Sequence, residues 1–412
     1  EPIWTDEISS QGAPVIFNGR LYTWGYRGKG ADLVEVVQAR EEATGKVIWE
    51  KTTHDFMSDT VYDRYSIGSV TVDPKSENVF AATAHGLLTC YSKSGEIVWQ
   101  VSLMERFGRL TFPNARAGAP VIDGDRVIIH AVTSYWGADG PAKDRFLCFD
   151  KHTGDLIWSS TPGVGAPFLK DSSFSTPFLE TRQGKRVFYA GNGCGNVVCV
   201  NAMDGTPLWR FQAAIGGINI SPVIQDDLVY AIHGTENLDS TETGRAFAVR
   251  IPEDLNNTGG KVDPEQGGAP RLEPTSEAWR LPFEMFTSSP VLHDGKLYQV
   301  LKIGVLVCIE MKSGKVLWEE KLVNSQLHAS PLYADGRLYI PTYPGDFFVL
   351  NVTGAKPVIE HKITLEGNAI GSPALCNGRV YVHTTKKLYA FEIKNSGIRY
   401  GEPPADPQPE PG

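Results

Sequence analysis

Side chains suited to catalysis or binding gather in a few irregular stretches of this 412-residue sequence. Oxygen donors that could bind Ca²⁺ or act as general bases are Asp59, Asp63, Glu236, Asn237 and Asp346. Guanidinium groups that could pair with a carboxylate through two hydrogen bonds are Arg64, Arg109 and Arg116. Rings that could stack on a sugar or anchor a protein interface are Trp24, Tyr26, Tyr135 and Trp136. None of these residues belongs to a recognisable catalytic motif, so the elements around them must show how they are used.

A tight turn followed by a short strand that ends on tryptophan recurs along the chain. It occurs at residues 44–49, 94–99, 153–158, 204–209 and 313–318, and in degraded form at 353–358. Repetition at a period of roughly forty to sixty residues is typical of propellers and solenoids, in which each repeat is one supersecondary unit. The chain is therefore a series of copies of one unit.

Seven units begin with a strand that contains proline and continues into a tight hairpin. Asn-Gly and Asp-Gly pairs tolerate the positive φ angles of a type I′ turn. Such pairs stand at positions 18–19, 123–124, 294–295, 335–336 and 377–378. Runs with the period of two of a half-buried strand follow them, as in Arg337-Leu338-Tyr339-Ile340. One unit therefore has four strands, A to D, with tight turns between A and B and between C and D.

Eight such units follow one another, and the eighth is incomplete. They begin near Gly12, Gly68, Gly118, Ser175, Ile220, Ser288, Ala329 and Gly371. The last unit has strands A, B and C but no strand D, whereas Ile3 and Trp4 precede the first strand A without a unit of their own. An N-terminal strand that completes the last blade would hide both open edges. The sequence therefore predicts an all-β, eight-bladed propeller closed by its N-terminus, with one domain over residues 1–400.

These repeats resemble those of the quinoprotein-type (PQQ-like) β-propeller family, in which a Thr-Gly-Lys turn and a strand ending in Trp recur in each blade. The resemblance extends from Ile3 to about Ile393. In that family the repeated Trp packs between neighbouring blades, which implies a structural role for Trp49, Trp99, Trp158, Trp209 and Trp318. Within the family the chain resembles the periplasmic propeller lipoproteins of the outer-membrane β-barrel assembly machinery more closely than the quinoprotein alcohol dehydrogenases.

Composition limits the classes of partner. The net charge of −9 argues against nucleic acid, because phosphate binding needs a basic surface. The sequence has no run of about eighteen apolar residues, so we expect no transmembrane segment. The chain starts at Glu1 without a signal sequence, which suggests a processed form, and the family resemblance points to a periplasmic or otherwise exported protein. We expect a monomer whose Pro-rich residues 401–412 form a tail or linker.

The six cysteines do not form an obvious disulfide framework. Cys90, Cys148, Cys199 and Cys308 stand at one position of the repeat, in strand C. Equivalent positions in different blades are too far apart for a disulfide, so these residues are interpreted as small buried hydrophobic groups. Cys194 and Cys199 are close in sequence and leave one disulfide open.

The two faces of the predicted ring differ in chemistry. The A–B and C–D turns share one face and are short, apart from an insertion at 252–278 that we expect to be flexible because it is poor in apolar residues. The B–C and D–A loops share the other face and are long and varied, so we expect the binding site there, at the mouth of the central channel. The expected contributors are Trp24, Tyr26, Arg27, Asp63, Arg64, Arg109, Asn114, Arg116, Tyr135, Trp136, Glu236 and Asn237.

Three functions fit this face. The first is a non-catalytic scaffold that binds a protein partner without a cofactor, as the resemblance to the assembly-machinery lipoproteins implies. The second is a dehydrogenase that uses PQQ and Ca²⁺ to oxidise an alcohol or sugar; its family members hold the cofactor beneath a disulfide between adjacent cysteines, and this chain has no Cys-Cys pair. The third is a propeller that binds carbohydrate or another extracellular polymer. Fold alone does not separate the three. We favour the scaffold, because no catalytic motif is present.

Overall fold

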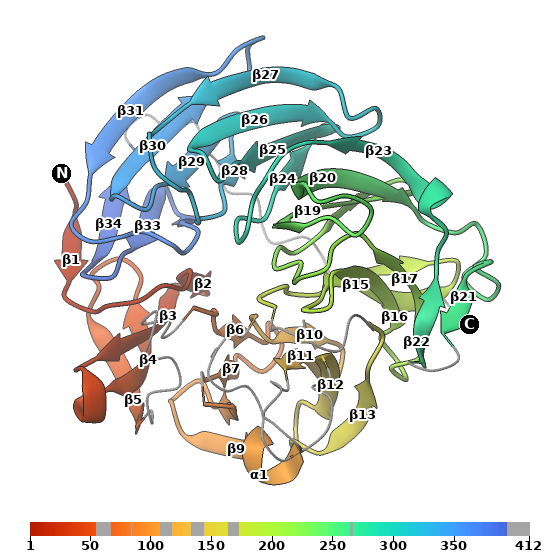
Figure 1. The fold of residues 1–412 in the computed structure, drawn as a ribbon. Helices are drawn as coiled ribbons and strands as arrows, with labels where there is room; N and C mark the ends of the chain where they lie inside the picture. Colours follow the sequence, from red (N-terminus) through yellow and green to blue (C-terminus); the bar gives the residue numbers. More distant parts are fainter. Residues whose placement is uncertain are drawn as a thin grey trace.

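The computed structural model describes residues 1–54, 67–83, 85–107, 118–132, 144–163, 173–263 and 267–393. Its strands form eight sheets that stand as blades around a central axis (Figure 1). Helical structure in this part is confined to short segments, namely α1 (Leu103–Phe107), η1 (Gly30–Asp32) and η2 (Pro274–Ser276). The predicted all-β, eight-bladed propeller is confirmed.

Blades 1 to 4 each use four consecutive strands. Blade 1 contains β2 (Val15–Phe17), β3 (Arg20–Arg27), β4 (Val34–Glu41) and β5 (Val47–His54). Blade 2 contains β6 (Thr71–Val72), β7 (Val79–Ala82), β8 (Leu87–Tyr91) and β9 (Ile97–Ser102). Blade 3 contains β10 (Val121–Asp123), β11 (Arg126–Val132), β12 (Asp144–Asp150) and β13 (Leu156–Ser160). Blade 4 contains β14 (Phe178–Arg182), β15 (Lys185–Gly191), β16 (Asn196–Asn201) and β17 (Pro207–Gln212).

Blades 5 to 8 keep the same order, except that blade 8 takes its outer strand from the N-terminus. Blade 5 contains β18 (Val223–Gln225), β19 (Leu228–Glu236), β20 (Thr243–Arg250) and β23 (Glu277–Leu281). Blade 6 contains β24 (Val291–His293), β25 (Lys296–Val300), β26 (Val305–Glu310) and β27 (Val316–Lys321). Blade 7 contains β28 (Leu332–Ala334), β29 (Arg337–Pro341), β30 (Asp346–Asn351) and β31 (Val358–Thr364). Blade 8 contains β32 (Ala374–Cys376), β33 (Arg379–His383), β34 (Leu388–Glu392) and β1 (Trp4–Asp6).

The N-terminal strand closes the ring as predicted. Strand β1 pairs antiparallel with β34, with Trp4 opposite Ala390. The amide of Ile3 also donates to the carbonyl oxygen of Ala390 at 2.8 Å. Both ends of the chain's β-structure are thereby held in one sheet, which removes two open edges.

The repeated tryptophans pack against the turn of the next blade. The Trp49 indole N–H donates to the Lys93 carbonyl oxygen at 3.0 Å, and a Cβ added to Gly95 would lie 2.8 Å from the Trp49 ring. The same contact with a turn glycine is made by Trp4, Trp99, Trp158 and Trp279. The predicted packing role is therefore confirmed for the blade seams. Trp279 is the member of this series in blade 5, where the insertion concealed it from the sequence pattern.

A small residue in strand C faces each of these rings. Trp99, Trp158, Trp209 and Trp318 lie opposite Cys90, Cys148, Cys199 and Cys308. Ala39, Ala248 and Ala390 take that place opposite Trp49, Trp279 and Trp4. All six cysteines of the chain are free thiols, so the disulfide left open between Cys194 and Cys199 is absent. Burial raises the pKa of the Cys90 thiol to about 12, which keeps it protonated.

Side-chain hydroxyls link the inner strands around the axis. The amide of Thr176 donates to the Ser221 hydroxyl oxygen at 2.9 Å, and the amide of Ser221 donates to that of Ser289 at 3.0 Å. The amide of Ser289 in turn donates to the Ser330 hydroxyl oxygen at 2.8 Å. Each of these residues precedes a proline, which keeps it extended. The Ser/Thr-Pro motif therefore joins blade to blade on the inner side of the ring.

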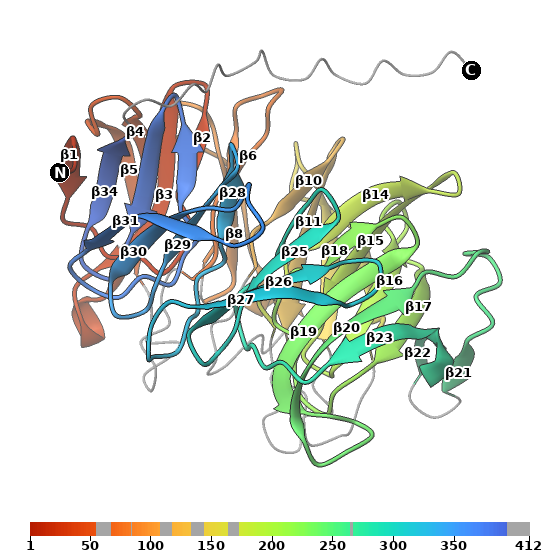
Figure 2. The same ribbon diagram turned by 90° about the horizontal axis from the view of Figure 1, so that it is seen from above.

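Two expectations about turns and loops were wrong. The pair Asp123-Gly124 does not occupy the centre of a type I′ turn. Asp123 pairs with Arg126, so the central residues are Gly124 and Asp125, and of these only Gly124 has positive φ. The insertion in blade 5 is not a flexible excursion: it forms β21 (Lys261–Asp263) and β22 (Gly267–Arg271), which extend the sheet of blade 4. Figures 1 and 2 place this ribbon at the outer margin of the ring beside β17. Leu255 and Leu272 supply the apolar contacts that the composition had concealed.

Candidate functional site

A cavity of about 1160 Å³ opens where the B–C and D–A loops meet around the axis. Blade 1 contributes residues 26–30, from the end of β3 and the loop that follows it, and blades 7 and 8 contribute Tyr343 and Lys386 from their B–C loops. The D–A segments contribute residues before the inner strands, among them Ser330 of the inner hydroxyl series and Ser69, whose hydroxyl oxygen accepts a hydrogen bond from the Ala13 amide at 3.1 Å. This channel-mouth cavity therefore lies on the face that the sequence predicts to carry the site.

The charge of the described lining is opposite to that of the whole chain. The charged side chains in that lining are Arg27, Lys29 and Lys386, and no aspartate or glutamate accompanies them. The chain as a whole has a net charge of −9. Because Arg27 is paired with Glu50, which lies outside the lining, Lys29 and Lys386 supply the net positive charge. A basic concavity in an acidic protein focuses a positive potential at its mouth. The described lining therefore favours a ligand or partner segment that carries negative charge.

Aromatic rings stand among the small and polar residues of the remaining wall. They belong to Tyr26, Phe174, Phe286, His328 and Tyr343. The His328 ring lies 5.2 Å from the Tyr343 ring, and its Nδ1 lies 3.2 Å from the Thr287 hydroxyl. Burial lowers the pKa of His328, so the ring is neutral near pH 7. Such rings offer flat apolar contact together with polar atoms at their edges.

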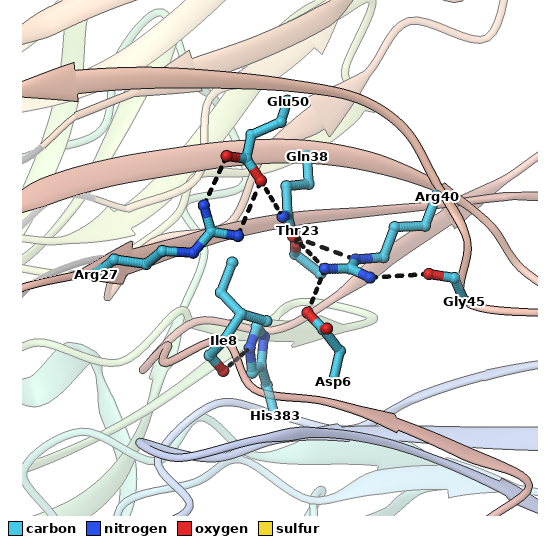
Figure 3. Close-up of polar contacts among 9 residues, drawn as sticks. All are labelled: Asp6, Ile8, Thr23, Arg27, Gln38, Arg40, Gly45, Glu50 and His383. Atoms are coloured by element: carbon cyan, nitrogen blue, oxygen red, sulfur yellow. Dashed lines mark hydrogen bonds and ion pairs between the residues drawn. The ribbon is translucent and has the colours of Figure 1, made fainter.

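Arg27 is held at the rim by a network that reaches the closing strand (Figure 3). Its guanidinium forms two hydrogen bonds to Glu50, at 2.6 and 2.9 Å, and these bonds lower the pKa of that carboxyl. The Gln38 amide also donates to Glu50, and the Gln38 carbonyl oxygen accepts from Arg40. Arg40 in turn binds Asp6 of β1. The position of the cavity rim is thus tied to ring closure.

The structure separates the predicted site residues into three groups. Tyr26 and Arg27 line the channel-mouth cavity. Trp24, by contrast, lies inside β3 and is buried in the seam with blade 2, because the β3–β4 ladder runs on to Arg27. The position assigned to Trp24 as an exposed loop ring was therefore wrong. Asn237 is buried and donates to the Glu242 carbonyl oxygen at 2.8 Å, and neither it nor Glu236 lines the cavity. The third group lies outside the described residues and comprises Asp63, Arg64, Arg109, Asn114, Arg116, Tyr135 and Trp136.

Sequence analysis overlooked several residues of the cavity. Lys29, His328, Tyr343 and Lys386 were not singled out, because each stands in a short connection without unusual composition. Their position in the repeat was nevertheless a usable signal. Lys29, Tyr343 and Lys386 each follow strand B of a blade, and all B–C loops converge on one face. Register in the repeat is thus a better guide to this site than residue type.

The described residues do not fit a quinone site that depends on Ca²⁺. They contain no group of three or more His, Cys, Asp or Glu side chains that could hold a metal ion. Asp346, one of the predicted oxygen donors, is paired with Lys362 at 2.9 Å and accepts a hydrogen bond from Thr364 on the outer strand. Asp59 and Asp63 lie outside the described residues. No catalytic step through a quinone follows from this arrangement.

Known proteins share both the repeat and the fold. A family model described as "Outer membrane protein assembly factor BamB" matches residues 34–253 and 269–399, and the unmatched residues between them fall in the blade 5 insertion. The protein of that name from Yersinia pestis is 26% identical, over 61% of this chain and 69% of its own length.

Solved structures with low sequence identity show the same fold. BamB from Moraxella catarrhalis aligns with a TM-score of 0.64 at 14% identity, and covers 95% of this chain and 99% of its own. Quinohemoprotein alcohol dehydrogenase from Comamonas testosteroni aligns with a TM-score of 0.63 at 13% identity, and covers 98% of this chain and 78% of its own. The family model, by contrast, matches the sequence of this chain over most of the chain's length. The protein therefore belongs to the family of the outer membrane protein assembly factor BamB.

Proposed function

We propose that this protein is a non-catalytic, exported scaffold that binds a protein partner through its channel-mouth cavity. The observation that carries the proposal is the described lining, which combines Arg27, Lys29 and Lys386 with aromatic rings and lacks carboxylates. Arginine and aromatic side chains are enriched where protein interfaces hold most of their binding energy. The partner segment that suits this lining presents acidic groups beside apolar side chains.

The names of the relatives suggest the setting of that partner. Both the family model and the Yersinia pestis relative are described as outer membrane protein assembly factors. We therefore propose that this protein acts in the periplasm and that its partner belongs to the machinery that assembles outer membrane proteins. In the described part of the chain, no helix is long and apolar enough to cross a membrane.

Charge reversal on the two faces tests the proposal. The variant Lys29→Glu with Lys386→Glu alters the cavity, and Lys312→Glu with Lys315→Glu alters exposed lysines at the C–D turn on the opposite face. Because both double variants change the charge equally, long-range effects cancel. Binding to the purified assembly machinery of the same organism, measured by biolayer interferometry, should weaken about tenfold or more for the cavity variant alone. Equal losses from both variants would refute the cavity as the site.

Residues outside the described part, which the sequence pattern assigns to the binding face, provide a second test. Substituting Arg64, Arg109 and Tyr135 together by alanine should abolish binding and leave the thermal melt unchanged. A complex whose contacts fall on residues 252–278 or on the Thr-Gly turns would contradict this assignment. The carbohydrate alternative is weaker, because the burial of Trp24 removes one of its four stacking rings.

A further inference from the structure

The outer strand of blade 7 is exposed along its whole length. All seven residues of β31 are exposed, including the apolar Val358 at 62%, Ile359 at 44% and Ile363 at 38%. No other strand in the described part of the chain has this pattern. His361 takes the place that tryptophan has in the other blades, since it lies opposite Val349. Blade 7 therefore lacks the indole ring of tryptophan that anchors the outer strand in the seams of the other blades.

Blade 4 shows how this fold covers such an edge. Strand β22 of the insertion lies parallel to β17, and the amide of Leu272 donates to the Arg210 carbonyl oxygen at 2.9 Å. Leu208, which precedes the blade 4 tryptophan, is only 9% exposed there. The residues that precede tryptophan in blades 3 and 6, Ile157 and Leu317, are 45% and 39% exposed. An extended segment can therefore dock on an outer edge of this ring and bury its apolar side chains.

The side chains of β31 leave its edge accessible for the same kind of addition. Glu360 is paired with Arg337 at 2.7 Å, and Lys362 is paired with Asp346 at 2.9 Å, so both charges are neutralised within blade 7. Ile363 pairs with Phe347, which packs against blade 8, and Ile359 pairs with Leu350, which belongs to the core toward blade 6. Apolar side chains therefore lie on both faces of the strand. Uncovered strands of this kind are templates for β-addition.

We propose that the edge of β31 binds an extended segment of a partner polypeptide as a fifth strand of blade 7. Backbone hydrogen bonds supply affinity that does not depend on sequence, and alternate apolar side chains of the added strand cover Val358 and Ile363, which share one face of β31. The occupant is an unfolded or extended chain with alternating apolar residues. This surface lies on the rim of the ring (Figure 1) and is separate from the channel-mouth cavity.

A peptide-binding measurement tests this proposal. The probe is a short fluorescent peptide in which valine alternates with threonine and lysine, and fluorescence anisotropy reports its binding to the full chain. The variant Val358→Lys with Ile363→Lys should lower the affinity about tenfold or more. The matched control, Ile157→Lys with Leu317→Lys, adds the same charge to outer strands of similar exposure and should leave the affinity unchanged. Equal losses from both variants would overturn the proposal.

Three further measurements separate a β-ladder from other modes of contact. Two peptides, one methylated on the odd and one on the even backbone nitrogens, should differ, because only one set of N–H groups faces β31. Retained affinity in both peptides would mean that no ladder forms. Hydrogen exchange on the unmodified protein should show new protection at residues 358–364 when peptide is added, and protection elsewhere would contradict the site. Sedimentation of the protein alone should show no dimer that depends on Val358 and Ile363, because such a dimer would make a second copy the occupant.

Discussion

At the scale of single residues, the turn glycines are fixed by two different physical demands. Gly19 has φ of +73° with no other atom near its missing Cβ, whereas Gly95 has φ of +88° and lies against the Trp49 ring. We expect Gly19→Ala to destabilise the fold by about 1–2 kcal/mol through backbone strain alone. Gly95→Ala adds a steric clash with the ring and should cost about 1–3 kcal/mol more. Chemical denaturation measures the difference, and equal losses would show that the Trp–Gly contact contributes nothing.

A buried histidine at the closure gives the fold a residue-scale dependence on pH. His383 bonds the Ile8 carbonyl oxygen at 3.0 Å, and burial lowers its pKa to about 4 (Figure 3). The unfolded chain has a histidine pKa of about 6.5, so it binds the proton first as the pH falls. The stability that neutral His383 provides is therefore complete above about pH 6.5 and is lost toward pH 4, by about 3 kcal/mol. The melting temperature of His383→Gln should change less with pH over this range than that of the unmodified protein. An equal dependence on pH in both proteins would exclude this role.

At the scale of elements, closure depends on a strand of three residues. Removing residues 1–8 would open the edge of β34 and deprive the buried Arg40 guanidinium of Asp6. Loss of one partner of a buried ion pair commonly costs about 3–5 kcal/mol. We therefore expect a clearly lower melting temperature for the truncated protein. Asp6→Asn keeps the strand and removes the charge, so its melting temperature should lie between those of the truncated and the unmodified protein. An unchanged melting temperature after truncation would refute the closure.

At the scale of the whole molecule, fold similarity alone does not establish a cofactor. The alcohol dehydrogenase neighbour shares the ring, yet the described residues here gather no metal-binding group. We expect protein purified with added PQQ and Ca²⁺ to retain neither in stoichiometric amount. An absorbance spectrum and metal analysis test this expectation. Retention of both would favour the quinoprotein dehydrogenase. Asp59 and Asp63, which lie outside the described residues, would then be candidate Ca²⁺ ligands.

The repeat, the number of blades and the closure could all be predicted from the sequence alone. These features follow from local rules, since turn glycines, alternating strands and the recurrent tryptophan each act within a few residues of the chain. The missing strand D and the unassigned Trp4 were enough to pair the two ends. The same rules failed where a contact partner is remote in sequence, as at Trp24 and in the blade 5 insertion.

Only the tertiary structure decided which side chains meet. Tyr26 lies more than 300 residues before Tyr343 and Lys386 in the chain, and the closing of the ring alone brings it to the same cavity. Leu208 is buried because β22 returns to its edge, whereas β31 stays exposed because nothing in the described chain returns to it. Burial depends on the neighbours that a folded chain supplies, whereas repetition and turn chemistry are properties of short segments. The sequence therefore predicted the architecture, and the structure identified the cavity and the open edge.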